Sequence, residues 1–437
     1  MASAEPSWVK AWTGGRPAVQ VGNAAEFNRM TGGDHYSCLA LFATPRPGMV
    51  VLPQRVEGSW VRDTAELLGW GGVEVHDGVA GDGRVSAAIE ADDVLLRRMR
   101  EAEGPVVPWG WTEAFDRITP APAGVLEAIG RYESKAGSHR LFRALAPGHR
   151  DVVVPAQAPA GTRRALARRL AAGPAVLKRE YGVGGNGVLV LPARTRRAGA
   201  LAREWARPDV VVEEYVPGGG PYRDPTFDAV IDAGGGVHPV GVGAMDVEGT
   251  RYQGVTVGPG VLPDDLAATV LRFGTDVGRA LASDGYRGWF DVDFVTDREG
   301  RPAPTEINLR LTGPAVAFTL KARLDALRGG AHLVRTVDQL RLGARLPPAF
   351  LREHLGEIRD ACRECGVTVL LTIPTAAFEP DPYVGMAFAA RTADALDRAE
   401  ALARRASGDL GLWFDGLTDR GRRTWIRRTP RPRAPRP

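Results

Sequence analysis

The segment from Trp289 to Arg310, WFDVDFVTDREGRPAPTEINLR, constrains the fold of this chain more than any other. In its first half, Asp291 and Asp293 alternate with bulky apolar residues. Successive side chains of a β-strand point to opposite faces, so the two acids share one face and the apolar residues pack from the other. The Asp-Arg-Glu-Gly run that follows is a turn signal. The pattern therefore predicts a β-hairpin with one polar face.

The second strand of this hairpin carries Glu306, Asn308 and Arg310 on one face by the same period of two. Across a hairpin the polar faces meet, which brings carboxylates, an amide oxygen and a guanidinium together. Oxygen ligands with few carboxylates suit Mg²⁺, which keeps water and phosphate oxygens in its shell. The guanidinium suits a transferring phosphoryl group or an oxyanion. We predict a magnesium and phosphate site here; the alternative is a half-exposed hairpin with solvated acids.

A second feature is the glycine-rich stretch from Pro174 to Leu191, PAVLKREYGVGGNGVLVL. It contains a literal G-x-G-x-x-G, but a β-branched run follows where a dinucleotide-binding motif needs a helix. It also lacks the Gly-Lys-Ser/Thr of a Walker A loop. What remains is a flexible hairpin with Lys178 at its entry, the arrangement by which a glycine-rich lid covers ATP phosphates. A plain surface hairpin stays open as the alternative.

Lysine is scarce in this chain. Of its 56 basic residues only four are lysines, namely Lys10, Lys135, Lys178 and Lys321. Because arginine is used almost everywhere else, a remaining lysine marks a place that needs a compact ammonium on a thin stem, unless it remains by chance. Lys178, at the entry of the glycine hairpin, is therefore a candidate phosphate ligand.

The composition is that of a globular protein, with 25% charged and 44% hydrophobic residues. The sequence has no apolar run long enough for a transmembrane helix and no signal-peptide pattern at its N-terminus. Three cysteines argue against a disulfide framework and for a reducing compartment. We therefore expect a cytoplasmic location and no membrane partner.

The net charge of +4 is misleading, because the last 18 residues, from Arg420 to Pro437, hold eight arginines and no acids. Without those eight charges, the remaining 419 residues have a net charge of −4. The body of the chain does not predict a nucleic-acid-binding surface, so we expect no nucleic-acid partner. We interpret the basic tail as a solvated terminus with a disordered, Pro-rich end.

Residues 16 to about 118 alternate short buried strands with helical patterns, which predicts a small parallel sheet. Asn23 and Pro53 follow two of these strands, at the edge where open α/β sheets bind ligands. Helices, strands and glycine-rich segments fill residues 120 to 345. After about residue 346 a separate unit follows, with a buried strand run and an amphipathic helix.

In chain order, Lys135, Lys178, the glycine hairpin, VVVEEYV and FDVDF…EINLRLTG resemble the ATP-grasp superfamily, whose members are mostly carboxylate–amine ligases. The resemblance covers about residues 120 to 320 and implies an α/β (α+β) ATP-grasp fold that uses ATP and Mg²⁺. It implies an N-terminal pre-ATP-grasp α/β domain at 1–118, an ATP-grasp domain at 119–345 with a lid subdomain at about 151–216, an extra C-terminal domain at 346–419 and a basic tail at 420–437.

The resemblance also implies roles for single residues. Lys178 and Arg310 would be catalytic, and Asp293, Glu306 and Asn308 would hold Mg²⁺. In the hinge, Glu213 would face the exocyclic amine of adenine and the Val216 N–H a ring nitrogen. The acid that binds ribose would be Asp224 or Asp228, because the family's usual place for it is interrupted here. The implied ATP-binding residues are Lys135, Lys178, Gly182, Gly184, Gly185, Gly187, Glu213, Glu214, Tyr215, Val216 and Asp224.

The implied activity is amide or peptide bond formation through an acyl phosphate, giving ADP and phosphate. The extra unit after residue 346 is similar to the C-terminal domain of the pheganomycin-type peptide ligases, which join an amino-acid-like carboxylate to the amine of a peptide. The expected partners are thus ATP, a small carboxylate and an amine or peptide. Several alternatives stay open: an amino-acid ligase without peptide specificity, a small-molecule kinase on the same scaffold, a non-catalytic nucleotide-binding protein, and assembly as a homodimer.

Overall fold

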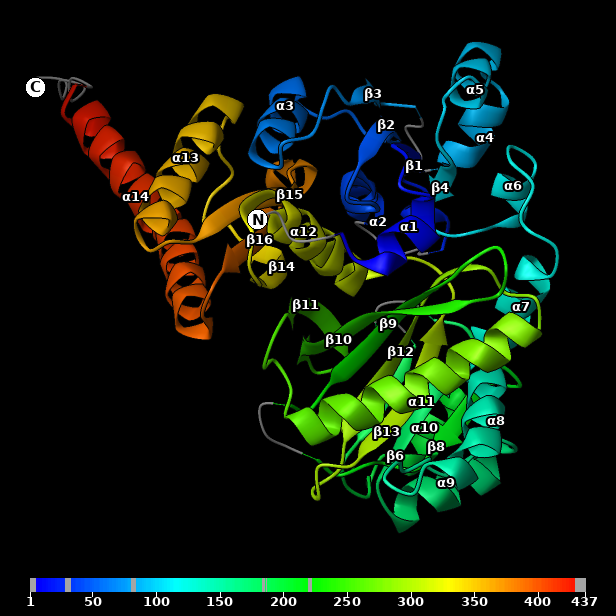
Figure 1. The fold of residues 1–437 in the computed structure, drawn as a ribbon. Helices are drawn as coiled ribbons and strands as arrows, with labels where there is room; N and C mark the ends of the chain where they lie inside the picture. Colours follow the sequence, from blue (N-terminus) through cyan, green and yellow to red (C-terminus); the bar gives the residue numbers. More distant parts are fainter. Residues whose placement is uncertain are drawn as a thin grey trace, which may run out of the picture.

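The computed structural model describes residues 5–27, 33–79, 84–182, 185, 187–218 and 222–428, without the side chains of 33 and 411–428. The described residues form three sheets (Figure 1). The N-terminal part holds a four-stranded sheet, the centre an eight-stranded sheet, and the lid a second four-stranded sheet. Across these ranges, no helix combines the length and the apolar character that a membrane span requires.

The N-terminal sheet has the strand order β3-β2-β1-β4, and all its pairs are parallel, as the alternation of strands and helices predicts. Valines of β1 pack against α4 and α5, while η2 and α3 join a larger core that extends to the central sheet. The elements are α1 Ser7–Thr13, β1 Ala18–Val21, η1 Ala24–Glu26, α2 Gly33–Tyr36, η2 Ser37–Phe42, β2 Pro47–Val51, α3 Gly58–Leu67, β3 Glu74–His76, α4 Val85–Glu90, α5 Asp93–Arg100, β4 Val106–Pro108 and α6 Glu113–Asp116.

The central sheet has the order β13-β12-β9-β10-β11-β14-β16-β15, and each neighbouring pair is antiparallel. Helix α11 packs on one face of the β9 and β12 strands, and α12 packs on the other face toward the N-terminal part (Figure 1). The elements are α7 Val125–Tyr132, α8 Lys135–Leu145, η3 Ala146–Gly148, β9 Pro225–Ile231, β10 Val237–Glu248, β11 Arg251–Val257, α11 Asp264–Ser283, β12 Gly288–Thr296, β13 Pro302–Asn308, α12 Gly313–Arg328 and β14 Leu333–Arg341.

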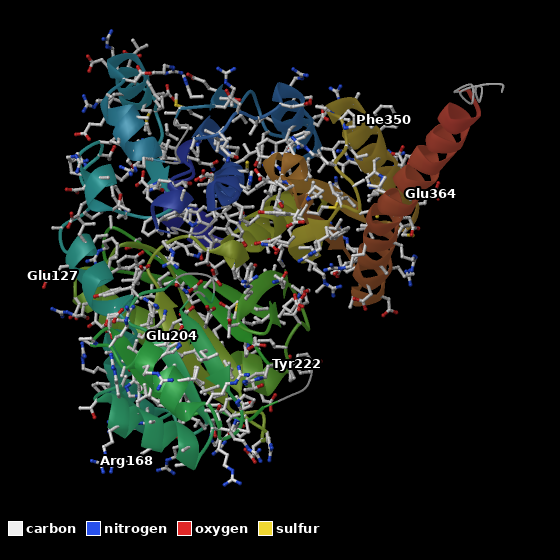
Figure 2. The ribbon with its side chains drawn as sticks, turned by 180° about the vertical axis from the view of Figure 1, so that it is seen from behind. Glu127, Arg168, Glu204, Tyr222, Phe350 and Glu364 are labelled. Atoms are coloured by element: carbon white, nitrogen blue, oxygen red, sulfur yellow. The ribbon has the colours of Figure 1, made fainter. Side chains whose placement is uncertain are left out.

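The lid is a small antiparallel sheet of order β5-β8-β6-β7 with two helices on it and its own apolar core. Strands β6 and β7 form the hairpin that the glycine-rich stretch predicts, with Ala175 opposite Leu191 and Lys178 opposite Val188. Seen from behind, Arg168 of α9 marks the outer end of this lid (Figure 2). The elements are β5 Gln157–Pro159, α9 Arg163–Ala172, β6 Ala175–Arg179, β7 Val188–Leu191, α10 Ala198–Trp205 and β8 Val210–Glu213.

The C-terminal unit does not form a sheet of its own. Its strands β15 and β16 extend the central sheet, because β16 pairs with β14, and its helices α13 and α14 pack with these strands in a further core. Helix α14 continues into the segment predicted as a basic tail, and the Pro-rich end of that tail lies outside the described residues. The elements are α13 Pro348–Glu364, β15 Thr368–Ile373, η4 Thr375–Phe378, β16 Tyr383–Ala390 and α14 Ala393–Arg428.

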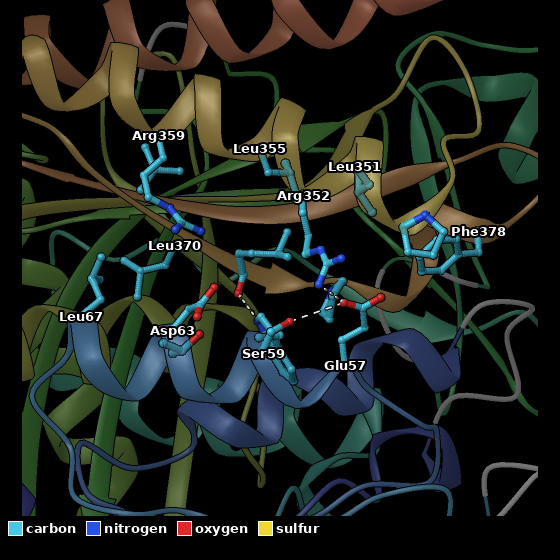
Figure 3. A pocket seen from close by; sticks show the side chains of 16 residues that line it. Glu57, Ser59, Asp63, Leu67, Leu351, Arg352, Leu355, Arg359, Leu370 and Phe378 are labelled. Atoms are coloured by element: carbon cyan, nitrogen blue, oxygen red, sulfur yellow. Dashed lines mark hydrogen bonds and ion pairs between the residues drawn. The ribbon is translucent and has the colours of Figure 1, made fainter.

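Helix α3 of the N-terminal part faces α13 and β15 of the C-terminal unit across a cavity of about 140 Å³ (Figure 3). Trp60 donates its indole N–H to the Leu371 carbonyl at 2.7 Å, and Arg352 lies 3.7 Å from Glu57. These contacts join the N-terminal part to the C-terminal unit at the β15 edge of the central sheet.

Candidate active site

The hairpin β12–β13 has the register that brings the predicted polar residues together. Asp291 lies opposite Asn308, and Asp293 lies opposite Glu306. The four side chains therefore form two adjacent cross-strand pairs on one face. The apolar residues between them pack against α11 in the core. The same alternation thus buries the apolar face of the hairpin in the core and places the polar residues together on the other face.

Glu306 is held by Lys135, the first residue of α8. The Lys135 side chain is 3% exposed and its ammonium forms an ion pair with the Glu306 carboxylate. Ser134 caps this helix by accepting a hydrogen bond from the Gly137 N–H at 3.0 Å. Burial alone would raise the pKa of Glu306, but Lys135, with further cations, lowers it to about 2. Glu306 is therefore an anion whose charge is offset by a buried lysine.

The two aspartates of β12 differ in their partners. Asn308 donates from Nδ2 to Asp291 Oδ1 at 2.7 Å, whereas Asp293 Oδ1 is buried and has no hydrogen-bond partner within the described ranges. Burial raises the pKa of Asp291 to about 6. Burial, together with the charges of Asp291 and Glu306, raises the pKa of Asp293 well above its ordinary value. A metal cation on this face would oppose both shifts and satisfy the unpartnered oxygen.

Arg310 is fixed at the end of the same face. Its Nη2 donates to Asn308 Oδ1 at 2.8 Å, and its Nη1 forms an ion pair with Glu133. Glu133 also accepts a hydrogen bond from the Leu309 N–H at 3.0 Å. The guanidinium lies 5.8 Å from the ring centroid of Phe27. Contacts from three sides hold the group in place, as a site for a transferring phosphoryl group requires.

Lys178 connects the lid to the hairpin. On β6 it forms an ion pair of 2.6 Å with Glu213 of β8, and both side chains are almost fully buried. Its ammonium also donates to the Thr305 carbonyl of β13 at 3.3 Å. The second oxygen of Glu213 accepts a hydrogen bond from Gln157 at 3.0 Å. The Glu213 side chain therefore faces Lys178 and Gln157, and its expected contact with adenine remains a prediction.

The hinge residues Glu214, Tyr215 and Val216 follow the lid strand β8 and line the main cavity. Asp224 lines it as well, and burial raises the pKa of this acid to about 6. Asp228 is instead fully buried in β9, where its carboxylate accepts a hydrogen bond from the Trp289 indole at 2.9 Å. Of the two candidate ribose acids, Asp224 is thus the one placed to meet a ligand.

The glycine loop contacts the turn between β10 and β11. Gly185 has a φ of 79°, and a Cβ atom added there would lie 1.7 Å from the Thr250 carbonyl oxygen. Gly187 has a φ of 76°. Gly182 lies just after β6, and Gly184 falls outside the described residues. At position 185, therefore, only glycine permits both the backbone conformation and the close approach of the lid to the central sheet.

We expect Gly185→Ala to raise the KM for ATP and to lower the melting temperature, because an alanine at this φ with a Cβ against Thr250 costs at least about 1 kcal/mol. Gly199→Ala, in helix α10 of the same lid, is the matched control, since a Cβ there meets no neighbour within 4 Å. It should leave the KM unchanged. Equal KM values for both variants would show that the contact at Gly185 has no part in nucleotide binding.

These side chains surround one cavity of about 560 Å³. Its lining includes Lys178, Arg310 and the hairpin acids, together with Tyr36, Tyr252 and Tyr383. Residues 312–314, at the N-terminus of α12, also line it. Of the predicted residues in the described part, Lys135, Gly182 and Gly187 do not line the cavity. Lys135 instead contacts it through Glu306.

The donor set of the hairpin fits Mg²⁺. Asp293 and Glu306 offer carboxylates and Asn308 an amide oxygen, and the buried, unpartnered oxygen of Asp293 is an open position for a cation. Mg²⁺ usually takes one or two protein carboxylates and completes its shell with water and phosphate oxygens. Over the described ranges, no group of three His, Cys, Asp or Glu side chains is arranged to hold a metal. The hairpin therefore fits a cation that completes its coordination with the oxygens of a phosphate ligand.

Sequence reasoning missed several residues around this cavity. Glu133, which fixes Arg310, precedes Lys135 by two residues, yet nothing in the local pattern shows that it reaches β13. Asn23, expected at a ligand-binding edge, instead accepts a hydrogen bond from the Trp109 N–H at 2.8 Å and is fully buried. Pro53 does not line the cavity. The three tyrosines come from segments far apart in the sequence, so their gathering could not be predicted.

No family model and no curated protein matches the sequence. Three of the similar solved structures are an N5-carboxyaminoimidazole ribonucleotide synthetase from Thermus thermophilus, an N5-carboxyaminoimidazole synthase from Aspergillus clavatus with ADP and 5-aminoimidazole ribonucleotide, and the biotin carboxylase domain dimer of a Hydrogenobacter thermophilus 2-oxoglutarate carboxylase with MgADP, ADP and bicarbonate.

The first of these is 17% identical, with a TM-score of 0.56 over 90% of this chain and 98% of its own. The second is 14% identical, with a TM-score of 0.54 over 82% and 98% of the two chains. The third is 13% identical, with a TM-score of 0.50 over 87% and 88%. These neighbours share the ATP-grasp fold, and this chain has the same fold. The sequence-based prediction of the fold is thereby confirmed.

Proposed function

We propose that the protein is an ATP-dependent carboxylate–amine ligase that works through an acyl phosphate. The observation that carries the proposal is the polar face of the β12–β13 hairpin. There Asp293, Glu306 and Asn308 line a cavity together with Arg310, Lys178 and the lid hinge, and the buried Lys135 pairs with Glu306. Similar structures bind MgADP or ADP in the same fold, which supports ATP as the nucleotide.

In this proposal the adenine lies against the hinge residues 214–216, the ribose near Asp224, and the phosphates between Lys178 and the hairpin. A carboxylate oxygen of the substrate attacks the γ-phosphorus, and the bond to ADP breaks. Lys178, Lys135 and Arg310 offset the charge that develops on the phosphoryl oxygens. Asp293, Glu306 and Asn308 would hold Mg²⁺, which supplies Lewis-acid stabilisation of phosphate charge when bound.

The neutral substrate amine then attacks the carbonyl carbon of the acyl phosphate with its lone pair. The bond between that carbon and the phosphate oxygen breaks, and the nitrogen passes a proton to the departing phosphate, so that an amide and inorganic phosphate remain. This route needs no covalent nucleophile from the protein. A closed lid excludes water, which would otherwise hydrolyse the acyl phosphate. The contact of Gly185 with Thr250 is the kind of lid closure that this chemistry needs.

We further propose that the amine belongs to a peptide, as in the pheganomycin-type ligases. The support is the position of Tyr383, which begins β16 in the C-terminal unit and lines the main cavity. The unit after residue 346 therefore contributes to the wall of the cavity as well as to packing. Kinetics with amines of increasing length test this idea: equal rates for free amino acids and long peptides would leave an amide ligase without peptide specificity.

The activity itself is tested by phosphate release from ATP and Mg²⁺ with pools of amino acids and short peptides. We expect release to require both an acid and an amine, and we expect hydroxylamine to give a hydroxamate when the acid alone is present. Retention of the phosphoryl group on a small molecule, with ADP formed and no phosphate released, would instead identify a kinase. Location in the cytoplasm and assembly as a homodimer remain predictions.

A further inference from the structure

A buried carboxylate is hydrogen-bonded to a tyrosine that lines the main cavity. Asp338 is in β14 and is 2% exposed. The pairing of β14 with β16 is regular up to Val337 and resumes at Leu340, so Asp338 and Gln339 lie in a β-bulge. Bulges often redirect a side chain next to an active site, and Gln339 lines the cavity. The irregular pairing thus places Asp338 directly before a residue that lines the cavity.

Asp338 is surrounded by tyrosines from three parts of the chain. Tyr36, from α2 of the N-terminal part, donates its hydroxyl to the Asp338 carboxylate. Tyr252 of β11 and Tyr383 of β16 are close enough that its charge raises the pKa of both phenols, in addition to the larger effect of burial. All three tyrosines line the cavity. The Tyr252 hydroxyl is buried and, within the described part of the chain, has no hydrogen-bond partner.

The charge of Asp338 lacks the paired lysine that Glu306 and Glu213 have. Glu306 pairs with Lys135, and Glu213 pairs with Lys178. In the described ranges, no lysine, arginine or histidine forms an ion pair with Asp338, and burial raises its pKa to about 7 despite the hydrogen bond from Tyr36. A buried carboxylate is costly unless a cation accompanies it. A ligand that supplies the cation would remove this cost.

We propose that Tyr36 and Asp338 form the binding site for the protonated amine of the second substrate. The proposal rests on the ligase function proposed above and names the substrate class as a cationic amine, such as the N-terminal ammonium of a peptide. An ammonium donates up to three hydrogen bonds, for which the Asp338 carboxylate and the unpartnered Tyr252 hydroxyl are acceptors. The faces of the tyrosine rings attract the same cation.

The location also agrees with the order of the reaction. The cavity continues from the hairpin acids to the tyrosines without leaving the site. A carboxylate activated beside Arg310 and an amine held near the tyrosines would therefore occupy the same cavity, and the ammonium would pass one proton to the Asp338 carboxylate before its nitrogen attacks. The tyrosines come from the N-terminal part, the central sheet and the C-terminal unit, so the amine site exists only where these three parts meet. This gives the C-terminal unit a role in substrate binding.

Asp338→Asn tests the proposal, because asparagine keeps the shape and an acceptor for Tyr36 but loses the charge. The acid and amine found by pooled screening are the substrates, with glycinamide as a defined cationic amine and hydroxylamine as a neutral one. We expect the KM for the cationic amine to rise about 10- to 100-fold, the range of a charge-assisted hydrogen bond. The ratio of amide to hydroxamate formed should fall by a similar factor, and the KM for ATP should stay the same.

Two further variants complete the experiment. Asp246→Asn, on an exposed position of β10 outside the cavity lining, is the matched control and should leave the ratio unchanged. Tyr36→Phe should raise the KM for the amine by a smaller factor, about threefold to tenfold for a single lost hydroxyl contact. If Asp338→Asn lowers the yield of folded protein, the KM of Tyr36→Phe for the amine still tests the proposed site. Melting temperatures of all variants are measured in parallel.

An amine KM that is unchanged in both site variants would overturn the proposal. Equal loss of amide and hydroxamate would also overturn it, because Asp338 would then act on the nucleotide site or the fold. If the wild-type protein forms no hydroxamate and shows no acid-dependent phosphate release, the ligase function itself fails and the amine site fails with it. Hydroxamate formation by the wild-type protein therefore distinguishes failure of the ligase function from failure of the amine site alone.

Discussion

Replacing Glu306 by glutamine is expected to reduce turnover by about 100-fold or more and to raise the Mg²⁺ concentration that half-saturates the enzyme. The carboxylate is opposite Asp293 and is an anion at neutral pH. Glutamine has no charge for the metal, and a metal ion contributes several kcal/mol to the stabilisation of phosphoryl charge. Mg²⁺ titrations of phosphate release measure the shift, and calorimetric titration of MgADP measures binding without turnover.

The melting temperature separates the role of Glu306 in catalysis from its role in folding. The variant leaves Lys135 buried without its anion, and breaking one partner of a buried pair costs about 3–5 kcal/mol. We therefore expect Glu306→Gln to lower the melting temperature and Lys135→Met with Glu306→Gln to recover part of it. If the double variant recovers stability but does not recover Mg²⁺ binding, the result would support Glu306 as a metal ligand. A double variant with the Mg²⁺ dependence of the wild-type protein would exclude Glu306 as a metal ligand.

The aspartates of β12 provide the comparison within the hairpin. Asp293→Asn should raise the Mg²⁺ requirement more than Asp291→Asn. Among the described residues Asp293 Oδ1 has no hydrogen-bond partner, whereas Asp291 Oδ1 accepts a hydrogen bond from the Asn308 amide. If the effects are reversed, the metal position belongs to Asp291, one step along the strand from the predicted ligand. Asp291 and Asp293 are neighbours on the same face of β12, so each variant serves as the control for the other.

Local periodicity explains why the hairpin could be predicted from the sequence. In β12 each apolar residue fixes the face of its polar neighbours, so Asp291 and Asp293 are placed without knowledge of the rest of the fold. The register with Glu306 depends in addition on an irregularity of the pairing between Asp293 and Phe294, which the sequence pattern does not show. The same reasoning from periodicity holds for the lid, where the β-branched run after the glycines predicts the strand that pairs with Lys178.

Contacts between distant segments were beyond this reasoning. The strands after residue 346 are predicted as strands, but their choice of partner is not local, and β16 adds to the central sheet at β14. Asp338 looks like an ordinary acid in a β-branched run, since neither the bulge nor Tyr36 is visible from its neighbours. Sequence reasoning therefore grouped the hairpin acids with Arg310 and Lys178, and it did not include the tyrosines that line the same cavity.

Lysine scarcity is also local information, and it leads to the second large effect. Lys178→Ala is expected to weaken ATP binding and nearly abolish turnover, because it removes a cation from between the lid and the Thr305 carbonyl of the hairpin. It also leaves Glu213 buried without its partner at 2.6 Å. Lys178→Ala with Glu213→Gln should recover part of the lost stability. If ATP binding recovers as well, Lys178 acts on the fold and has no phosphate role.

Lys178→Arg is the sharper form of this test, because it keeps the charge. The ammonium is enclosed by Glu213, the Thr305 carbonyl and the lid strands, and its side chain is 7% exposed. A planar guanidinium is wider and directs its donors in a fixed fork, so it should displace the lid and raise the KM for ATP. Lys321→Arg is the matched control: Lys321 pairs with Asp325 at 2.6 Å on α12, outside the cavity lining. There, arginine should leave the kinetics unchanged. Full activity in Lys178→Arg would mean that a lysine or an arginine can fill this position equally well. Lysine scarcity would then not indicate that position 178 needs a compact ammonium.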